Sequence, residues 1–247
     1  MKDWKKVYHK VLKEATSGLA RRYYRFRYAH YYGGIYTADA WGCFLGCVYC
    51  WARPVPASRC TFYEPDEVVR RLSRRPQVRL SFGEPTLYKE HLLAVLDQLQ
   101  DVDLFILETN GLLLDEDYIQ ALENYAHFVH VRMSLKGVDR QTAIENTSFD
   151  VFEDQMATVE RLSQSRLSFH LALLDVYSGE EVQQLISRLK EIGMNRGTGV
   201  KVDSCSLPQI EFERFVYYKH LDRRLRSWSR CPTLDKTQVR LNDKDSY

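Results

Sequence analysis

The sequence Trp41-Gly42-Cys43-Phe44-Leu45-Gly46-Cys47-Val48-Tyr49-Cys50-Trp51 decides how the rest of the chain is interpreted. Its three cysteines follow the pattern CxxxCxxC, and a loop this compact can turn three thiolates toward one metal centre. Structural zinc sites usually have four protein ligands, and iron–sulfur clusters are also held by thiolates, most often four. This loop supplies three, and the next cysteine, Cys60, lies ten residues later. A four-iron cluster held here would therefore keep one iron open to a small molecule.

Length and composition bound the class of protein. The chain has 247 residues, of which 45% are hydrophobic, enough for one large α/β domain or two small ones. No apolar run approaches the roughly 18–20 residues that span a bilayer, and the basic start leads into no signal peptide. We therefore expect a soluble, cytoplasmic protein with no membrane contact. Six cysteines without a secretory signal favour metal or redox chemistry over a disulfide framework.

Charge is distributed unevenly, although the formal net charge is only +2. The first 30 residues carry nine Lys and Arg against two Asp and Glu, and residues 214–240 carry eight against two. Residues 31–213 carry seventeen against twenty-seven. Basic ends on an acidic body either pack on that body or bind a polyanion. The same two alternatives apply to the segment from Arg21 to Tyr28, in which arginines alternate with aromatic rings. These side chains could bind the phosphates and bases of a nucleic acid, or they could pack against the protein.

The periodicity predicts one amphipathic helix over residues 3–16 and then a series of strand–helix units. The predicted strands cover residues 35–40, 78–82, 103–109, 128–135, 167–175 and 200–202, and the helices between them cover 65–75, 89–100, 115–125, 149–164 and 179–192. Six such units in tandem imply an α/β fold with a parallel sheet, either barrel-like or doubly wound.

Polar side chains gather where the predicted strands end. The cysteine loop follows the first strand, and the next three strands end at Gly83-Glu84-Pro85, Thr109-Asn110-Gly111 and Ser134-Leu135-Lys136. In a barrel of parallel strands, functional groups collect at this end. We therefore expect these loops to build one site; the alternative is that they are ordinary loop residues.

The cysteine spacing, with an aromatic residue before the last cysteine, resembles the cluster loop of the radical S-adenosylmethionine (radical SAM) superfamily. The resemblance covers residues 33–205 and implies a partial (β/α)6 TIM-type barrel. It leaves a short basic N-terminal extension over residues 1–32 and a basic C-terminal extension over residues 206–247. It also implies two cofactors, S-adenosyl-L-methionine and a [4Fe-4S] cluster held by Cys43, Cys47 and Cys50.

The polar loops match further elements of that superfamily. Gly83-Glu84-Pro85 resembles the GGEP-type loop that binds the methionine amino group, with Phe82 where a first glycine is usual. Thr109-Asn110-Gly111 resembles the TNG turn of the glycyl-radical-enzyme activases. Ser134-Leu135-Lys136 resembles their S-x-K element, which contacts the ribose and the carboxylate of S-adenosylmethionine.

Two more residues are candidates for the cofactor site. Tyr49 matches the aromatic residue beside the last cluster cysteine, whose backbone lies near the adenine in that superfamily. His170, on the fifth predicted strand, either lines the pocket or is structural. The expected cofactor-binding residues are therefore Tyr49, Gly83, Glu84, Thr109, Asn110, Ser134, Lys136 and His170.

The resemblance implies reductive cleavage of S-adenosylmethionine to methionine and a 5′-deoxyadenosyl radical, which abstracts hydrogen from a substrate. An external one-electron donor is then a required partner. The substrate is either a protein, as for a glycyl-radical activase, or a nucleic acid or nucleotide, for which the basic and aromatic ends of the chain supply contacts. The segment after the last predicted strand, from Asp203 through residues 214–230, lies where substrate specificity often resides.

Two other interpretations stay open at this point. In the first, the cysteine loop binds zinc and stabilises a module without enzymatic activity. In the second, the fold binds S-adenosylmethionine without cleaving it. The scattered cysteines Cys60, Cys205 and Cys231 are unliganded thiols, ligands of a second cluster, or thiols with a chemical role.

Overall fold

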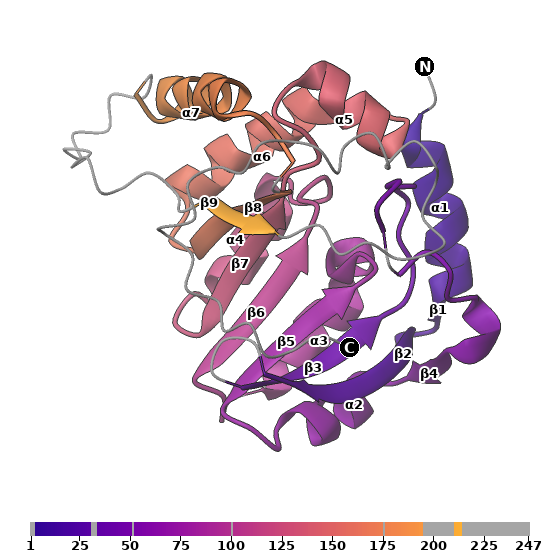
Figure 1. Ribbon diagram of the computed structural model, residues 1–247. Coiled ribbons are helices and arrows are strands. Elements are labelled where there is room, and N and C mark those ends of the chain that lie inside the picture. Colours follow the sequence, from indigo (N-terminus) through magenta and orange to yellow (C-terminus); the bar gives the residue numbers. More distant parts are fainter. Residues whose placement is uncertain are drawn as a thin grey trace.

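The computed structural model describes residues 3–30, 34–50, 52–99, 101–174, 176–194 and 210–213. In these ranges the chain forms a curled sheet with helices packed along its outer face (Figure 1). The helices are α1 Trp4–Ala15, α2 Pro65–Leu72, α3 Lys89–Gln98, α4 Glu116–Glu123, α5 Arg140–Thr147, α6 Phe152–Gln164 and α7 Gly179–Met194, with short 3-10 turns η2 Ala57–Arg59 and η3 Pro85–Leu87. None of these described helices is long and apolar enough to cross a membrane.

The strands are β1 Thr16–Ser17, β2 Ala20–Ala29, β3 Ile35–Ala40, β4 Thr61–Tyr63, β5 Gln77–Phe82, β6 Leu104–Thr109, β7 Val129–Ser134, β8 Ser168–Leu174 and β9 Ile210–Glu213. Parallel pairing runs in the order β3-β5-β6-β7-β8-β9, and helices connect successive strands of this series. Parallel neighbours need such crossover connections. The sheet is the predicted partial (β/α)6 barrel, and an antiparallel β2 extends it beyond β3.

Alternation along the strands gives the sheet an apolar outer face and a polar inner face. On β5, Val78 and Leu80 are buried in the main core, whereas Arg79 and Ser81 reach Glu108 on the neighbouring β6. Successive side chains of a strand point to opposite faces. The helices therefore cover the Val78 and Leu80 face, and the barrel interior is lined by charged and polar groups.

The predicted elements agree with the structure over most of the chain, with differences at α5, at β9, and at β1, β2 and β4, which the sequence analysis did not predict as strands. The region predicted as one helix over residues 149–164 is preceded by a separate helix, α5, whose N-cap Asp139 accepts a hydrogen bond from the Thr142 N–H. The sixth strand was predicted at residues 200–202, which lie outside the described residues. In the structure β9 occupies the sixth position. The division of the chain at residues 32 and 205 stays a prediction, although the sheet continues on both sides of these limits.

The basic N-terminal segment packs on the body of the protein. Arg21 is completely buried, and Arg22 donates to the carbonyl oxygens of Glu14, Ala57 and Cys60. The Tyr23 ring is also buried and stacks on Phe26. For this end of the chain, the structure therefore favours packing over polyanion binding. The basic segment 214–240 lies outside the described residues.

His91 on α3 joins the helix to the start of β2. Its Nδ1 lies 2.7 Å from the Leu19 carbonyl oxygen and must donate there, so Nε2 accepts from the Tyr23 hydroxyl at 2.9 Å. Burial lowers the pKa of His91 to about 4, and the hydrogen bond to Leu19 opposes this shift. Because an unfolded histidine titrates near pH 6.5, the unfolded chain takes up the proton first as the pH falls. The stabilising contribution is therefore complete above about pH 6.5 and is lost toward pH 4.

We expect the free energy of unfolding to fall by about 2 kcal/mol between about pH 7.5 and pH 5 through His91 alone. His91→Gln removes this titration, so the variant should show a smaller fall than the wild type in urea unfolding at the two pH values. His127→Gln, at an exposed histidine, is the matched control and should keep the wild-type pH dependence. Equal falls in wild type and His91→Gln would contradict the assignment.

Candidate functional site

The cysteine loop follows β3 and is anchored on two sides. Phe44 is buried and stacks on Trp4 of α1, with ring centroids 5.0 Å apart, and meets Tyr8 edge-on at 5.8 Å. On the other side, the Val48 N–H donates to the Asn146 carbonyl oxygen of α5 at 2.9 Å. The helix predicted over residues 3–16 is thus a support for this loop. The thiols of Cys43, Cys47 and Cys50 are free of disulfide bonds.

The three thiols lie close enough to perturb one another. Burial raises the pKa of Cys43 well above its usual range, and the neighbouring Cys47, Glu84 and Cys50 raise it further. Burial also raises the pKa of Cys47, while the Lys136 ammonium and a hydrogen bond with Tyr49 lower it. Thiolates are the metal-binding form, and a bound cation supplies the charge that stabilises them.

The loop after β5 is held against the start of the cysteine loop by its backbone. The Gly83 N–H donates to the Ala40 carbonyl oxygen at 2.8 Å, and the Glu84 N–H donates to the Gly42 carbonyl oxygen at 2.7 Å. A Cβ on Gly83 would lie only 2.4 Å from the Gly42 oxygen, so a glycine is required there.

The preceding residue, Phe82, stands where the resemblance to the GGEP-type loop leads us to expect glycine. Its φ of +92° is a conformation that L-residues rarely adopt and that costs about 1–3 kcal/mol. Glycine takes this conformation freely, so the structure gives a physical reason for glycine at this position. In this chain the Phe82 ring stacks on Tyr24 of β2, with centroids 5.3 Å apart. Phe82 in place of glycine therefore strains the backbone at this position, and it adds an aromatic contact with Tyr24.

The carboxylate of Glu84 joins the loops after β5 and β6. One carboxylate oxygen accepts from the hydroxyls of Thr86 at 2.7 Å and Thr109 at 2.6 Å, and from the Thr86 N–H at 3.2 Å. The other accepts from the Asn110 N–H at 2.8 Å. Glu84 is 1% exposed. Its side chain therefore sets the geometry of both loops before any cofactor is considered.

Arg21 of β2 completes this arrangement from outside the predicted core. Its guanidinium donates to the Pro85 carbonyl oxygen at 2.5 Å and to the Glu84 carbonyl oxygen at 2.6 Å. Burial lowers the pKa of Arg21, while nearby groups including Glu84 and Cys43 raise it. Sequence reasoning treated Arg21 only as part of a basic stretch and missed this role. The sequence contains no signal for it, since the partner lies 63 residues away.

The loops after β6 and β7 are joined by side chains of the next helices. Gln155 of α6 donates to the carbonyl oxygens of Asn110 at 2.7 Å and Ser134 at 3.0 Å, and accepts from the Lys136 N–H at 2.9 Å. Asn146 of α5 donates to the Lys136 carbonyl oxygen at 2.6 Å. Gln155 is a polar residue in the apolar stripe of α6, which is a sequence signal that went unused.

The predicted cofactor residues fall into one group, apart from His170. The Lys136 ammonium donates to the Ser134 hydroxyl at 2.8 Å and lies 5.9 Å from the centroid of the Tyr49 ring. The Lys136 ammonium also lowers the pKa of the Cys47 thiol, so the two groups lie close to each other. Tyr49, Gly83, Glu84, Thr109, Asn110, Ser134 and Lys136 thus surround the cysteine loop. His170 instead pairs with His130, with ring nitrogens 2.6 Å apart, on the inner face of the sheet.

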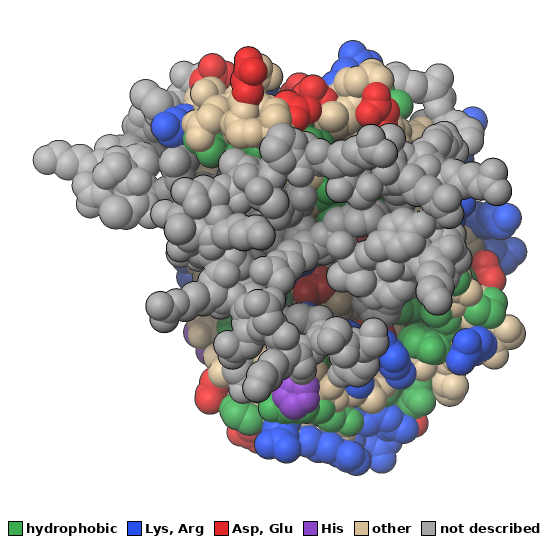
Figure 2. Space-filling view, viewed as in Figure 1, with side chains coloured by type: hydrophobic (Ala, Val, Ile, Leu, Met, Phe, Trp, Pro, Cys, Tyr) green, Lys and Arg blue, Asp and Glu red, His purple; other side chains and the backbone are tan. Residues whose placement is uncertain are grey.

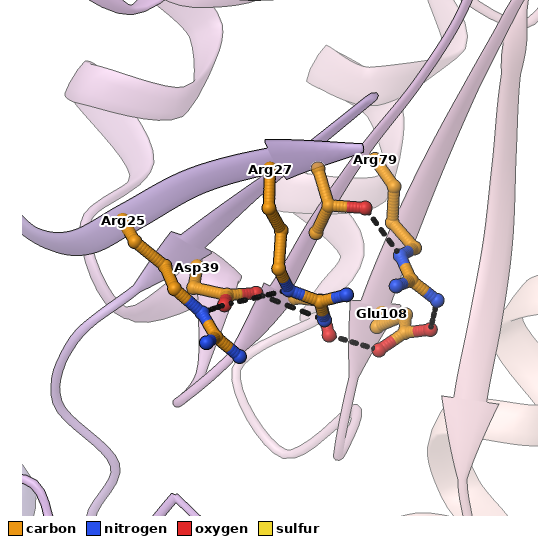
Figure 3. Close-up of polar contacts among 7 residues, drawn as sticks. Arg25, Arg27, Asp39, Arg79 and Glu108 are labelled. Carbon is orange, nitrogen blue, oxygen red and sulfur yellow. Dashed lines mark hydrogen bonds and ion pairs between the residues drawn. The ribbon is translucent and has the colours of Figure 1, made fainter. Parts of the chain in front are cut away.

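A charged network, centred on Asp39 and Glu108, covers that inner face (Figure 3). Arg25 and Arg27 both bind the Asp39 carboxylate, and Arg79 binds Glu108 at 3.1 Å. In the face shown in Figure 2, several Asp and Glu side chains lie over the region of α5 and α7, with Lys and Arg beside them, and Lys and Arg gather along the lower rim. Sequence reasoning did not identify the inner network.

The chain belongs to the radical SAM superfamily, because the family model described as "Radical SAM superfamily" matches residues 41–201. The cofactors of this superfamily are a [4Fe-4S] cluster and S-adenosylmethionine. No curated protein sequence matches the chain.

Solved structures share the fold at low sequence identity. The chain is similar to native anSMEcpe with bound AdoMet, with 18% identity, a TM-score of 0.55 and coverage of 71% of this chain and 49% of that one. It is also similar to SuiB of Streptococcus suis bound to S-adenosylmethionine, with 14% identity, a TM-score of 0.56 and coverage of 76% and 43%. The chain therefore spans about half the length of the structures that it matches.

The residues present fit both cofactors. The cysteine loop offers three free thiols beside the Lys136 cation. Asn110 is buried, and its Nδ2 has no hydrogen-bond partner among the described residues, so the site keeps a donor for a ligand. Within the described ranges, no three His, Cys, Asp or Glu side chains are placed to hold a single metal ion.

Arg21→Met should lower the free energy of unfolding by about 2–3 kcal/mol and weaken binding of S-adenosylmethionine. The variant removes two charge-assisted hydrogen bonds that hold the carbonyls of Glu84 and Pro85. Calorimetry on reconstituted protein measures the dissociation constant, and Arg74→Met, at an exposed arginine, should leave it unchanged. Wild-type binding by Arg21→Met would refute this role.

Gly83→Ala should lower the melting temperature and weaken binding of S-adenosylmethionine, because the new Cβ collides with the Gly42 carbonyl oxygen at 2.4 Å. Gly46→Ala is a matched control in the cysteine loop, since the nearest atom to its Cβ lies 4.0 Å away. Thermal unfolding and calorimetry compare the two variants. Equal effects of the two substitutions would contradict the steric argument.

Proposed function

We propose that this protein is a radical SAM enzyme that cleaves S-adenosylmethionine reductively and abstracts hydrogen from a peptide or protein substrate. The observation that carries the proposal is the convergence of three free thiols and the Glu84-centred loops in one site. When bound to S-adenosylmethionine, a reduced four-iron cluster supplies one electron that breaks the sulfur–carbon bond, giving methionine and a 5′-deoxyadenosyl radical. An external one-electron donor restores the reduced state.

The chain's own residues would bind and orient the cofactors. Cys43, Cys47 and Cys50 are the proposed thiolate ligands, and the Lys136 ammonium near Cys47 adds positive charge beside them. Lys136 is also placed to bind the carboxylate of S-adenosylmethionine, because an ammonium suits that anion as a point charge. The Gly83-Glu84 loop would bind the amino group of S-adenosylmethionine, and the Glu84 side chain would hold this loop in its conformation. Holding the sulfonium against its electron source replaces a chance encounter by a fixed geometry.

A peptide or protein substrate is favoured over a nucleic acid by two observations. The first two arginines of β2 are directed at protein groups, as Arg21 and Arg22 bind backbone carbonyl oxygens. The solved structures include SuiB bound to precursor peptide SuiA, at 15% identity and a TM-score of 0.55, and anSMEcpe with the Kp18Cys peptide, at 18% identity and a TM-score of 0.54. The Ser134-Leu135-Lys136 element keeps the activase-like group as our proposal for the closest functional class.

The test is anaerobic reconstitution with iron and sulfide, followed by reduction and an assay for 5′-deoxyadenosine. Wild-type protein should bind about four irons and four sulfides per chain and release 5′-deoxyadenosine. Cys47→Ala should lose both properties, and Cys60→Ala, which removes a buried free thiol outside the loop, should keep them.

The same samples separate the remaining alternatives. If the protein binds zinc but not iron, the enzyme assignment is wrong and a zinc-stabilised module is favoured. A stable cluster with bound S-adenosylmethionine but no 5′-deoxyadenosine, with or without added peptide, would favour a non-cleaving binding protein.

A further inference from the structure

The inner face of the barrel is built in layers that follow the strand register. Asp39 pairs with Ser81, and Glu108 pairs with Arg132, which in turn pairs with His170. These side chains therefore form one row across five parallel strands. Two residues further along β5, β6 and β7 lie Gly83, Asn110 and Ser134, the proposed cofactor positions. Residues i and i+2 of a strand share a face and lie roughly 6.6 Å apart, so the charged row lies directly below the cofactor row.

Two arginines of β2 share one carboxylate on this face. Arg25 and Arg27 both bind Asp39, whose side chain is fully buried, through Nε at 2.7 Å and 3.0 Å. Arg27 adds a longer bond from Nη2 to the other Asp39 oxygen at 3.4 Å, whereas the two Nη groups of Arg25, which lies over the Tyr24 ring, have no hydrogen-bond acceptor among the described residues. The Arg25 side chain is 45% exposed and that of Arg27 is 25% exposed. This pair of guanidiniums therefore carries one positive charge more than Asp39 neutralises, and Arg25 keeps donors in contact with solvent.

The neighbouring carboxylate is also shared between arginines. Glu108 lies within ion-pair distance of Arg79 at 3.1 Å and Arg132 at 3.9 Å (Figure 3 shows Arg79 and Glu108). Burial lowers the pKa of His130 to about 4, so this histidine is neutral at pH 7 and adds no charge. Toward the N-terminal ends of β3 and β6, Ala29, Ile35 and Ile106 form a small apolar cluster.

We propose that Arg25 and Arg27, held by Asp39, bind an oxyanion of the peptide substrate and so place a neighbouring carbon below the cofactor row. The oxyanion is a carboxylate or a phosphate, because a planar guanidinium presents paired donors that match either group. Asp39 acts as a positioning residue, since it fixes both Nε atoms and leaves the Nη groups of Arg25 and Nη1 of Arg27 to the ligand. This inference rests on the proposed function for the identity of the substrate as a peptide.

A peptide-binding assay tests the proposal without requiring enzymatic turnover. Positional-scanning libraries of short peptides, with one position fixed as Glu, Gln or phosphoserine, are bound to reconstituted full-length protein with S-adenosylmethionine present. The wild type should prefer Glu or phosphoserine over Gln by about tenfold or more, the value of one charge-assisted hydrogen bond. Whichever of Glu and phosphoserine binds more tightly shows whether the oxyanion is a carboxylate or a phosphate.

Arg25→Gln/Arg27→Gln should abolish the preference. Arg70→Gln/Arg188→Gln makes the same charge change at exposed ion pairs on α2 and α7 and should retain it. A preference that is absent in the wild type, or that survives Arg25→Gln/Arg27→Gln, overturns the proposal. Arginine-dependent binding of a short RNA that exceeds peptide binding also overturns it, in favour of a nucleic-acid substrate.

Cluster content and 5′-deoxyadenosine are measured on the same preparations. A wild type that cleaves S-adenosylmethionine but shows no preference for anionic peptides refutes the oxyanion site alone. A wild type that binds anionic peptides through Arg25 and Arg27 but forms no cluster refutes the proposed function and leaves the anion site standing.

Discussion

The site depends on one buried carboxylate. Glu84 accepts hydrogen bonds from Thr86, Thr109 and Asn110, and these bonds lock the loop after β5 to the loop after β6. A buried carboxylate is stable only when hydrogen bonds or cations replace its hydration. Here the replacement comes from hydroxyl and backbone donors, and the Arg21 guanidinium binds the adjacent carbonyls. The strain at Phe82 and the close backbone contact at Gly83 are tolerated because this network determines the path of the chain around them.

The N-terminal residues contribute to the site even though they precede the first parallel strand. α1 supports the cysteine loop through Trp4 and Phe44, and β2 supplies Arg21 to one loop and Arg25 and Arg27 to the inner face. A segment that looks like a basic extension by composition is therefore part of the same sheet and the same site. Arg21 and Arg22 bind backbone carbonyl oxygens of the protein, so these two charges do not form a solvent-facing phosphate-binding surface.

The barrel interior combines an apolar floor with a charged wall. The floor is a small cluster around Ile106, and the wall carries the ion pairs of Asp39 and Glu108. Buried charges are costly unless they are paired and hydrogen-bonded, and a wall of this kind is hard to explain by stability alone. Its position one layer below the proposed cofactor positions is the reason why we propose that it binds a polar substrate group.

The sequence alone determined the fold class, the order of the strand–helix units and the cysteine loop, because hydrophobic periodicity and motif spacing are local properties. It also predicted that the loops at Gly83-Glu84, Thr109-Asn110 and Ser134-Lys136 lie at one edge of the sheet, since polar residues after apolar strands mark the C-terminal edge of a parallel sheet; their role in cofactor binding stays a prediction. It did not determine the partner of Arg21, the network of Asp39 and Glu108, or the pairing of His170 with His130. These contacts join residues from 12 to 64 positions apart, and only strand order and register bring them to one face. Tertiary structure therefore decided which charges stabilise the loops and which remain for a ligand.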